Sequence, residues 1–271
     1  MKVEDLKLIV QDKYGQIASQ SKLQNQSSCC GSTGCCDDMD YSIFSDDYTK
    51  LAGYNPDADL GLGCGLPTQY AEINEGNHVL DLGSGAGNDC FVARTIVGET
   101  GHVTGIDFTD AMLEKANKNL EKTGFKNISF VKGDIEQMPL NDNSFDVVVS
   151  NCVLNLVPDK QKAFSEIFRV LKPGGHFCIS DVVLTGELPQ KLQEAAEMYA
   201  GCVSGAVLKE EYLDIIKQQG FTDIEVKKEK EIEIPNNILL KYITLDKLRA
   251  FKREKVGIYS ITVNGTKNEQ L

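Results

Sequence analysis

The sequence predicts an α/β fold with a doubly wound, mostly parallel sheet that is flanked by helices. From residue 76 onward, short β-rich runs alternate with amphipathic stretches, which is typical of repeated βαβ units. A glycine-rich turn follows the first run, and an acidic residue ends the second, as in sheets that bind nucleotides. The chain has 271 residues, enough for one large domain with a small appendage.

The expected strands and helices follow from the spacing of apolar side chains. Strands are predicted at 78–82, 102–107, 128–132, 145–150 and 175–181. Helices are predicted at 1–20, 110–123, 160–171, 189–200 and 209–219. The alternating run 221–235 predicts further strand structure with one solvated face.

Three regions of different composition suggest the domain organisation. Residues 1–60 combine a short helix with a polar, cysteine-rich segment, which we expect to be mobile unless its cysteines are bound. Residues 61–225 form the main domain, which begins with a glycine-rich loop that is too apolar for a simple linker. Residues 226–271 are expected to form a small α+β appendage.

Charge and hydropathy exclude several classes of partner. The net charge of −12 opposes binding to nucleic acid, which requires a basic face. No apolar run approaches the length that spans a bilayer, so we expect no membrane association. The charged, amphipathic N-terminus is not a secretory signal, which predicts a cytoplasmic protein. We expect it to act as a monomer.

The run DLGSGAGND at 81–89 predicts a nucleotide site, because it follows a strand and precedes a helix. Its glycines, Gly83, Gly85 and Gly87, let the backbone turn tightly and approach a ligand. Asp107 ends the next strand, where a carboxylate can accept both hydroxyls of a ribose. Together these features favour an adenosine-containing ligand.

The glycine spacing is G-x-G-x-G after an acid, which resembles motif I of class I S-adenosylmethionine methyltransferases. The segment GDIEQMPLNDNSFDVVVSN at 133–151 is also similar to that family. From the residues alone, the alternative to a ligand contact is a helix-cap or turn carboxylate for Asp81 and a turn acid after Gly133 for Asp134. The resemblance implies S-adenosyl-L-methionine as cofactor, bound by Asp81, Gly83, Ser84, Gly85, Gly87, Asp107, Phe108, Asp134, Ile135 and Asn151.

Nine cysteines are the other unusual feature of the chain. Static disulfides are uncommon in the cytosol, so binding of a metal or metalloid, redox cycling and plain burial remain. Cys178 lies in an apolar run and is expected to be a small buried side chain. The doubled pairs Cys29-Cys30 and Cys35-Cys36 lack the spacing of a zinc ribbon, although zinc binding or disulfides among them stay open.

Three further cysteines are predicted to converge at the carboxyl ends of the strands, where ligands bind in such sheets. Cys152 follows the fourth strand, Cys202 follows a helix that caps the opening, and Cys64 lies in the glycine-rich loop. Each could instead fill the core. Trivalent arsenic prefers three sulfur ligands, and its lone pair can attack a methyl group without losing a proton. This suits a chain with only three histidines, none in an obvious base position.

The chain is similar to arsenite S-adenosylmethionine methyltransferases in several words: GLGCGLP, DLGSGAGNDC, GHVTGIDFT, VVSNCVLNLVPDK, RVLKPGG, SDV and YAGCVSGA. The resemblance implies that Cys152 and Cys202 bind As(III), with Cys64 as third thiol alternating between arsenic and a disulfide. Its disulfide partner would be Cys35 or Cys36. Cys90 is a further candidate for this redox relay. The resemblance also implies arsenite and methylarsonite as substrates, and thioredoxin or glutathione as reductant.

Two other functions fit parts of the sequence. DVVVSN and RVLKPGG also resemble methyltransferases that act on a quinone or another small-molecule carbon acceptor. A non-catalytic, thiol-rich metalloid binder would use the cysteines alone, but it has no need of the glycine loop or of Asp107. The sequence leaves open the number of methylation rounds and the role of residues 236–271.

Overall fold

The computed structural model describes residues 3–19, 46–186, 205–232, 236, 240, 243–253 and 257–269. Several predictions fall outside these ranges. They are the helix at 189–200 and the cysteines Cys29, Cys30, Cys35, Cys36 and Cys202.

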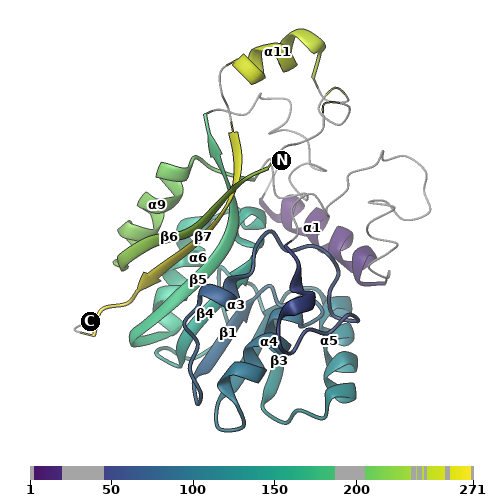
Figure 1. Ribbon diagram of the computed structural model, residues 1–271, viewed down its shortest axis with the longest axis vertical. Coiled ribbons are helices and arrows are strands. Elements are labelled where there is room, and N and C mark those ends of the chain that lie inside the picture. The colour runs from purple at the N-terminus through teal and green to yellow at the C-terminus, as the bar shows by residue number, and fades with distance from the viewer. Residues whose placement is uncertain are drawn as a thin grey trace.

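The centre of the molecule is a parallel sheet, as predicted (Figure 1). Its order is β3-β2-β1-β4-β5, so the connection reverses direction between β1 and β4. The predicted bounds are confirmed for β1 (His78–Leu82), β2 (His102–Asp107) and β3 (Ile128–Lys132). β4 (Phe145–Asn151) and β5 (Leu171–Thr185) are longer than predicted. The doubly wound α/β fold is therefore confirmed.

Two strands from the C-terminal part of the chain extend the same sheet. β7 (Gly257–Thr266) runs antiparallel to β5 along its whole length, and β6 (Thr222–Glu231) pairs with β7 at the edge. The sheet thus has seven strands in the order β3-β2-β1-β4-β5-β7-β6. The sequence suggested a separate appendage from residue 226. The structure differs because the apolar side chains of Ile261 and Val263 are fully buried in the main core.

Helices cover both faces of the sheet. α4 (Asn88–Val97) and α5 (Asp110–Thr123) contact β1, β2 and β3, while α6 (Lys160–Val170) and α9 (Lys209–Gln218) contact β5 and each other. Within the described ranges, the other helices are α1 (Val3–Ala18), α3 (Pro67–Tyr70), α11 (Leu245–Arg253) and the 3-10 turns η2 (Tyr48–Lys50) and η3 (Leu154–Leu156). No helix within the described ranges is long and apolar enough to cross a bilayer.

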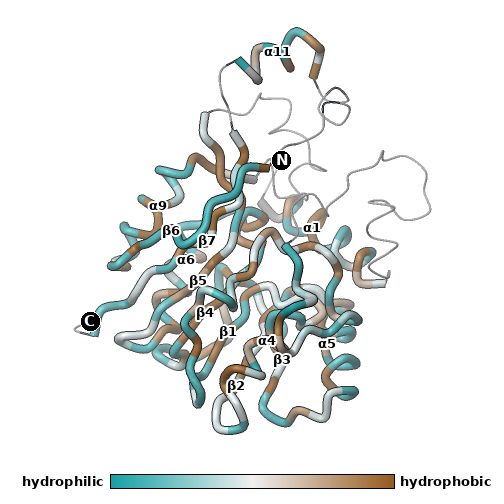
Figure 2. Tube along the Cα trace, viewed as in Figure 1, coloured by the Kyte–Doolittle hydropathy of each residue, from teal (hydrophilic) through white to brown (hydrophobic). Residues whose placement is uncertain are grey.

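The two main core clusters of the described residues lie on opposite faces of the sheet, because successive strand residues point to opposite faces. Leu80 and Leu82 of β1 pack with Phe164 of α6 and Tyr212 of α9 on one face. Val79 of β1 packs with residues of α1, α4 and α5 on the other. Hydrophobic colour follows the central strands in Figure 2, whereas β6 at the edge is largely hydrophilic. The two clusters fix the sheet rigidly between the helices, and its carboxyl edge carries the site.

Candidate active site

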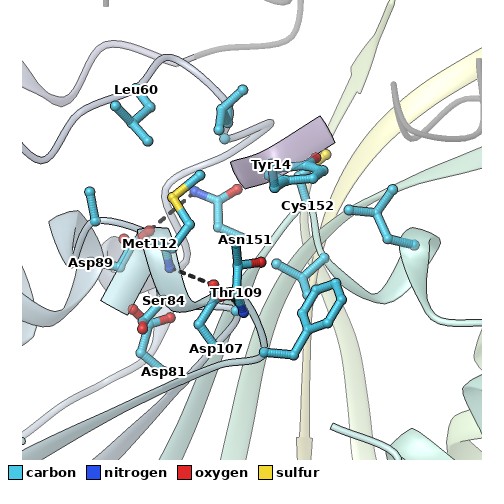
Figure 3. Close-up of a pocket in the computed structure, with 18 of the residues that line it drawn as sticks. Tyr14, Leu60, Asp81, Ser84, Asp89, Asp107, Thr109, Met112, Asn151 and Cys152 are labelled. Carbon is cyan, nitrogen blue, oxygen red and sulfur yellow. Dashed lines mark hydrogen bonds between the residues drawn. The ribbon is translucent and has the colours of Figure 1, made fainter. Parts of the chain in front are cut away.

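A large pocket lies at the carboxyl ends of the parallel strands (Figure 3). The segments that follow β1, β2, β3 and β4 all line it, and it encloses about 1180 Å³ including its open mouth. This is the predicted position for a ligand in a sheet whose strand order reverses between β1 and β4.

The glycine loop after β1 forms the floor of the pocket. Gly83, Gly85 and Gly87 all have positive φ, at 63°, 51° and 94°, which glycine adopts without strain. A Cβ on Gly87 would lie 2.8 Å from the ring of Phe130, so the loop also packs too tightly for a side chain there. The loop then enters α4 with Asn88 as its first residue. The predicted strand–turn–helix is confirmed.

Asp107 holds this loop from the end of β2. Its carboxylate accepts the backbone N–H of Gly85 at 3.0 Å and that of Thr109 at 2.8 Å. Burial raises the pKa of Asp107, although these hydrogen bonds partly offset the rise. The carboxylate therefore lines the pocket at the position predicted for a ribose contact.

Three pocket-lining residues each have a buried polar atom without a hydrogen-bond partner, although buried polar groups are normally paired. The atoms are Oγ of Ser84 on the glycine loop, Oδ1 of Asn88 directly after it, and Oγ1 of Thr109 after β2. A polar ligand in the pocket would satisfy them, so the residues present fit a nucleoside group.

Two further acids lie under the glycine loop. Asp81 at the end of β1 is buried and accepts the thiol of Cys90 at 3.2 Å. Burial and the neighbouring Asp89 raise its pKa well above the usual range. Burial likewise raises the pKa of Asp89 to about 6, although the hydroxyl of Tyr48 donates to it at 2.8 Å. Among the described residues, no lysine, arginine or histidine pairs with Asp81, Asp89 or Asp107, which favours a positively charged ligand.

Helix α1 closes one side of the pocket, a role that the sequence did not reveal. Lys7, Val10 and Tyr14 line the cavity. The ammonium of Lys7 donates to Asp134 at 2.7 Å and also contacts Glu136, which is buried. Asp134 and its neighbour Ile135 line the pocket where the sequence placed them. The amphipathic pattern of α1 shows a buried face but not what that face covers.

Asn151 connects β4 to the loop that carries Cys64. Its Oδ1 accepts the backbone N–H of Cys64 at 3.0 Å, and its Nδ2 donates to the carbonyl of Gly65 at 2.9 Å. The Nδ2 group also contacts the hydroxyl of Tyr48. A Cβ on Gly65 would lie 2.6 Å from Cβ of Ser180, so only glycine fits there. Asn151 thus holds the loop against the end of the sheet.

Cys152 follows Asn151 and lines the pocket (Figure 3). Its backbone has φ 59°, a left-handed conformation that is uncommon for residues with a side chain. Its N–H donates to the carbonyl of Ser180 at 2.7 Å, which fixes this turn against β5. Sγ of Cys152, Sγ of Cys64 and a carboxylate oxygen of Asp181 all lie within 4.8 Å of one another. The structure therefore brings two of the three predicted thiols together.

The remaining predicted residues separate into three groups: one in the pocket, two buried away from it, and three outside the described residues. Phe108 lines the pocket beside Asp107, and its carbonyl accepts the side chain of Gln11 at 3.1 Å. Cys90 is buried in α4 and bonds Asp81, while Cys178 is buried in β5 and donates to the carbonyl of Pro67. Cys202, Cys35 and Cys36 lie outside the described residues.

Known proteins with similar sequence or structure agree with this geometry. A family model of methyltransferase domains matches residues 73–220, which include the glycine loop, Asp107 and Cys152. The arsenite methyltransferase of Halobacterium salinarum is 40% identical over 235 residues, which cover 82% of this chain and 59% of that protein. The arsenite methyltransferase of Homo sapiens is 40% identical over 209 residues, which cover 72% of this chain and 55% of that protein.

A solved structure shows the same likeness in three dimensions. The arsenic (III) S-adenosylmethionine methyltransferase of Chlamydomonas reinhardtii is 38% identical, with a TM-score of 0.66. The match covers 77% of this chain and 68% of that one. The chain spans only 55 to 59% of the length of the two curated relatives above.

Proposed function

Since the chain belongs to the family of S-adenosylmethionine-dependent methyltransferases, we propose that it methylates arsenite. One observation supports this acceptor above all others: Cys152 lines the methyl-donor pocket, and Sγ of Cys64 lies within 4.8 Å of Sγ of Cys152. Thiolates are soft ligands that select thiophilic partners, and a carbon acceptor would have no use for them.

The pocket residues divide the binding of the cofactor among them. The loop from Gly83 to Gly87 approaches it closely, Asp107 accepts its ribose hydroxyls, and Asp134 with Ile135 holds its adenine. Ser84, Asn88 and Thr109 supply buried polar atoms that have no partner among the described residues. Asp81, Phe108 and Asn151 complete the wall of the pocket. When bound, S-adenosylmethionine supplies a methyl group activated by a sulfonium.

The cysteines hold the acceptor. Cys64 and Cys152 would bind As(III) directly, and Cys202 would supply the third thiolate. Methyl transfer leaves arsenic pentavalent, and its return to As(III) would take two electrons from the thiols of Cys64 and Cys35 or Cys36, which would form a disulfide. Thioredoxin or glutathione would then reduce that disulfide. Buried thiols ionise with difficulty, so arsenic must displace their protons as it binds.

The chemistry needs no general base, because the lone pair of arsenic carries no proton. The histidines agree with this. His78 and His102 lie at the opposite edge of the sheet, where their rings are 6.3 Å apart. His176 contacts the carbonyl of Ala71 at 2.6 Å. None of the three lines the pocket.

The test is methyl transfer by purified protein with arsenite, methyl-labelled S-adenosylmethionine and a thiol reductant. We expect label in methylated arsenic species that chromatography separates. Cys178→Ser is a matched control, because this buried cysteine lies in β5 away from the pocket lining. If no arsenic species carries label while the protein binds the cofactor, the proposal is wrong. If the protein instead methylates a quinone, and Cys152→Ser does so at the wild-type rate, the acceptor is a carbon atom.

A further inference from the structure

The thiol pair has a third neighbour that the sequence did not single out. Asp181 of β5 lies one residue beyond Ser180, the partner of Asn151 in the sheet register. Its carboxylate oxygen, Sγ of Cys64 and Sγ of Cys152 lie within 4.8 Å of one another. All three residues are buried, and Asp181 and Cys64 are 0% exposed.

Neutral donors surround this carboxylate. The hydroxyl of Tyr212 donates to Oδ2 at 3.2 Å, and the backbone N–H of Val182 donates to Oδ1 at 3.1 Å. The backbone of Asn155 contributes a further hydrogen bond. Burial raises the pKa of Asp181 to about 7, and the attraction of Lys160 offsets only part of the rise. The protein therefore buries an acid beside two sulfur atoms with its charge only partly compensated. Such a group lowers the stability of the fold, which indicates that it has a function.

The arrangement has a direction. Cys152 lines the pocket, whereas neither Cys64 nor Asp181 is among its lining residues. Cys152 is thus the member of the cluster that faces the methyl donor, and Asp181 lies behind the pocket lining, within 4.8 Å of both sulfur atoms. A charge that moves from the pocket to the thiols moves toward Asp181.

We propose that Asp181 stabilises the positive charge that arsenic acquires during methyl transfer. This inference rests on the proposed function. In the step, the lone pair of arsenic forms the As–C bond, and the pair of the broken C–S bond stays on sulfur. The cofactor sulfur becomes neutral, and arsenic, neutral in its trithiolate, becomes cationic. A fixed carboxylate in a dry site stabilises such a charge much more than water would.

The first test is single-turnover methylation by Asp181→Asn, which keeps the shape and removes the charge. Removing one preorganised electrostatic group commonly slows a step by about 10²-fold, and we expect a loss of that order with the KM for arsenite little changed. Asp181→Glu should recover part of the rate. Asp146→Asn is the matched control, because this acid lies at the opposite edge of the sheet, and it should react like the wild type. Unchanged rate in Asp181→Asn overturns the inference.

The second test measures binding without turnover. Zn²⁺ takes thiolate and carboxylate ligands and carries the positive charge that neutral thiol-bound arsenite lacks, so it serves as a charge probe. Asp181→Asn should weaken Zn²⁺ binding by about tenfold or more and arsenite binding far less. Tyr212→Phe, which removes the hydroxyl donor and keeps the charge, should slow methylation by no more than about fivefold. If Asp181→Asn and Tyr212→Phe slow methylation equally, the role of Asp181 is structural. The same conclusion follows if Asp181→Asn weakens the binding of Zn²⁺ and of arsenite equally.

Wild-type protein separates the two proposals. If it fails to methylate arsenite under the same conditions, the proposed function is at fault. If it succeeds and Asp181→Asn matches it in rate, only the role of Asp181 is wrong. If Asp181→Asn does not fold, Asp181→Glu is compared with Tyr212→Phe. Asp181→Glu moves the carboxylate by one methylene, whereas Tyr212→Phe leaves the carboxylate in place and removes only a hydroxyl. The charge proposal requires Asp181→Glu to slow methylation more than Tyr212→Phe does, and the reverse order overturns it.

Discussion

At the amino edge of the sheet, Asp146 of β4 is half-buried between two donors, whereas near the carboxyl edge Asp181 of β5 is fully buried beside two thiols. Partial burial alone would raise the pKa of Asp146, but the N–H of His78 and the ammonium of Lys172, each 2.7 Å away, lower it. Burial raises the pKa of Asp181 to about 7. The charged form of Asp146 is thus stabilised by a lysine and a backbone N–H, whereas that of Asp181 is only partly compensated by Lys160.

This contrast extends to the neighbouring acids. Asp81, Asp89 and Asp107 all lie at the carboxyl edge, and burial raises the pKa of each. The acid at the amino edge therefore contributes to stability, while those at the carboxyl edge resist ionisation until a cationic donor stabilises their charged forms. Such unfavourable groups persist where function requires them.

The largest expected effect separates a cysteine at the site from a buried cysteine elsewhere in the sheet. Cys152→Ser removes a soft ligand of the acceptor and should lower the rate of arsenite methylation by at least about 10²-fold. Cofactor affinity, measured by calorimetry, should remain within about threefold of wild type because the serine is nearly isosteric. Cys178→Ser should retain activity. Equal rates for the two variants would contradict the assignment of the site.

The second prediction compares the two acids by the pH dependence of stability. Folded Asp181 keeps its proton up to about pH 7, whereas an unfolded aspartate loses it near pH 4. Between these values the folded state binds more protons, so the free energy of unfolding falls as pH rises. Asp181→Asn should remove that fall and raise the free energy of unfolding at pH 8 by on the order of a few kcal/mol.

Asp146 should behave in the opposite way. Its lowered pKa contributes stability above the unfolded pKa, and this contribution is lost as pH falls. Asp146→Asn should therefore lower the free energy of unfolding at pH 8 by about 1 kcal/mol. Urea denaturation of both variants at pH 5 and pH 8 measures the difference. If Asp181→Asn lowers the free energy of unfolding at pH 8, as Asp146→Asn does, the two acids do not differ and the prediction is wrong.

Two glycines test the edges by overpacking. A Cβ on Gly65 would lie 2.6 Å from Cβ of Ser180, and one on Gly175 would lie 2.9 Å from the carbonyl of Asp146. Each change to alanine should cost about 1–3 kcal/mol, or several degrees in the thermal midpoint. Only Gly65→Ala displaces the loop of Cys64, so only it should weaken arsenite binding, as measured by tyrosine emission. If Gly65→Ala and Gly175→Ala weaken arsenite binding equally, the loss comes from lower overall stability and not from the loop of Cys64.

The smallest expected effect concerns the cover of the pocket. Lys7→Met removes the cation that contacts Asp134 and the buried Glu136 but keeps the length of the side chain. We expect cofactor affinity to fall about fivefold, since the contact is partly exposed and the loss is about 1 kcal/mol. Gly15→Ala is the control, because a Cβ there meets no atom within 4 Å. Unchanged affinity in Lys7→Met would mean that α1 does not depend on this contact.

The sequence predicted the central strands well because each is a short apolar run with clear punctuation. It underestimated β5, because Pro173 and Gly174 suggest a turn, yet β5 begins at Leu171 and pairs with β4 and β7. It predicted that Cys64 and Cys152 converge, and their sulfur atoms do lie within 4.8 Å of each other, although only Cys152 lines the pocket.

Other parts of the site depend on contacts between distant segments. Tyr48 and Lys7 reach the pocket from parts of the chain whose local pattern says nothing about a ligand. Asp181 did leave a signal, an acid inside the otherwise apolar strand CISDVVL. A charged residue in such a run is rarely buried without a partner or a role.

The order in which the chain can build its thiol pair follows from one hydrogen bond. The hydroxyl of Ser260 in β7 donates to the carbonyl of Cys64 at 2.5 Å, and so joins positions 196 apart in the chain. β7 must insert between β5 and β6 before this bond can form. During synthesis the Cys64 loop therefore stays unanchored on this side until nearly the whole described chain has left the ribosome. The loop of Cys64 is therefore fully anchored only after β7 has joined the sheet.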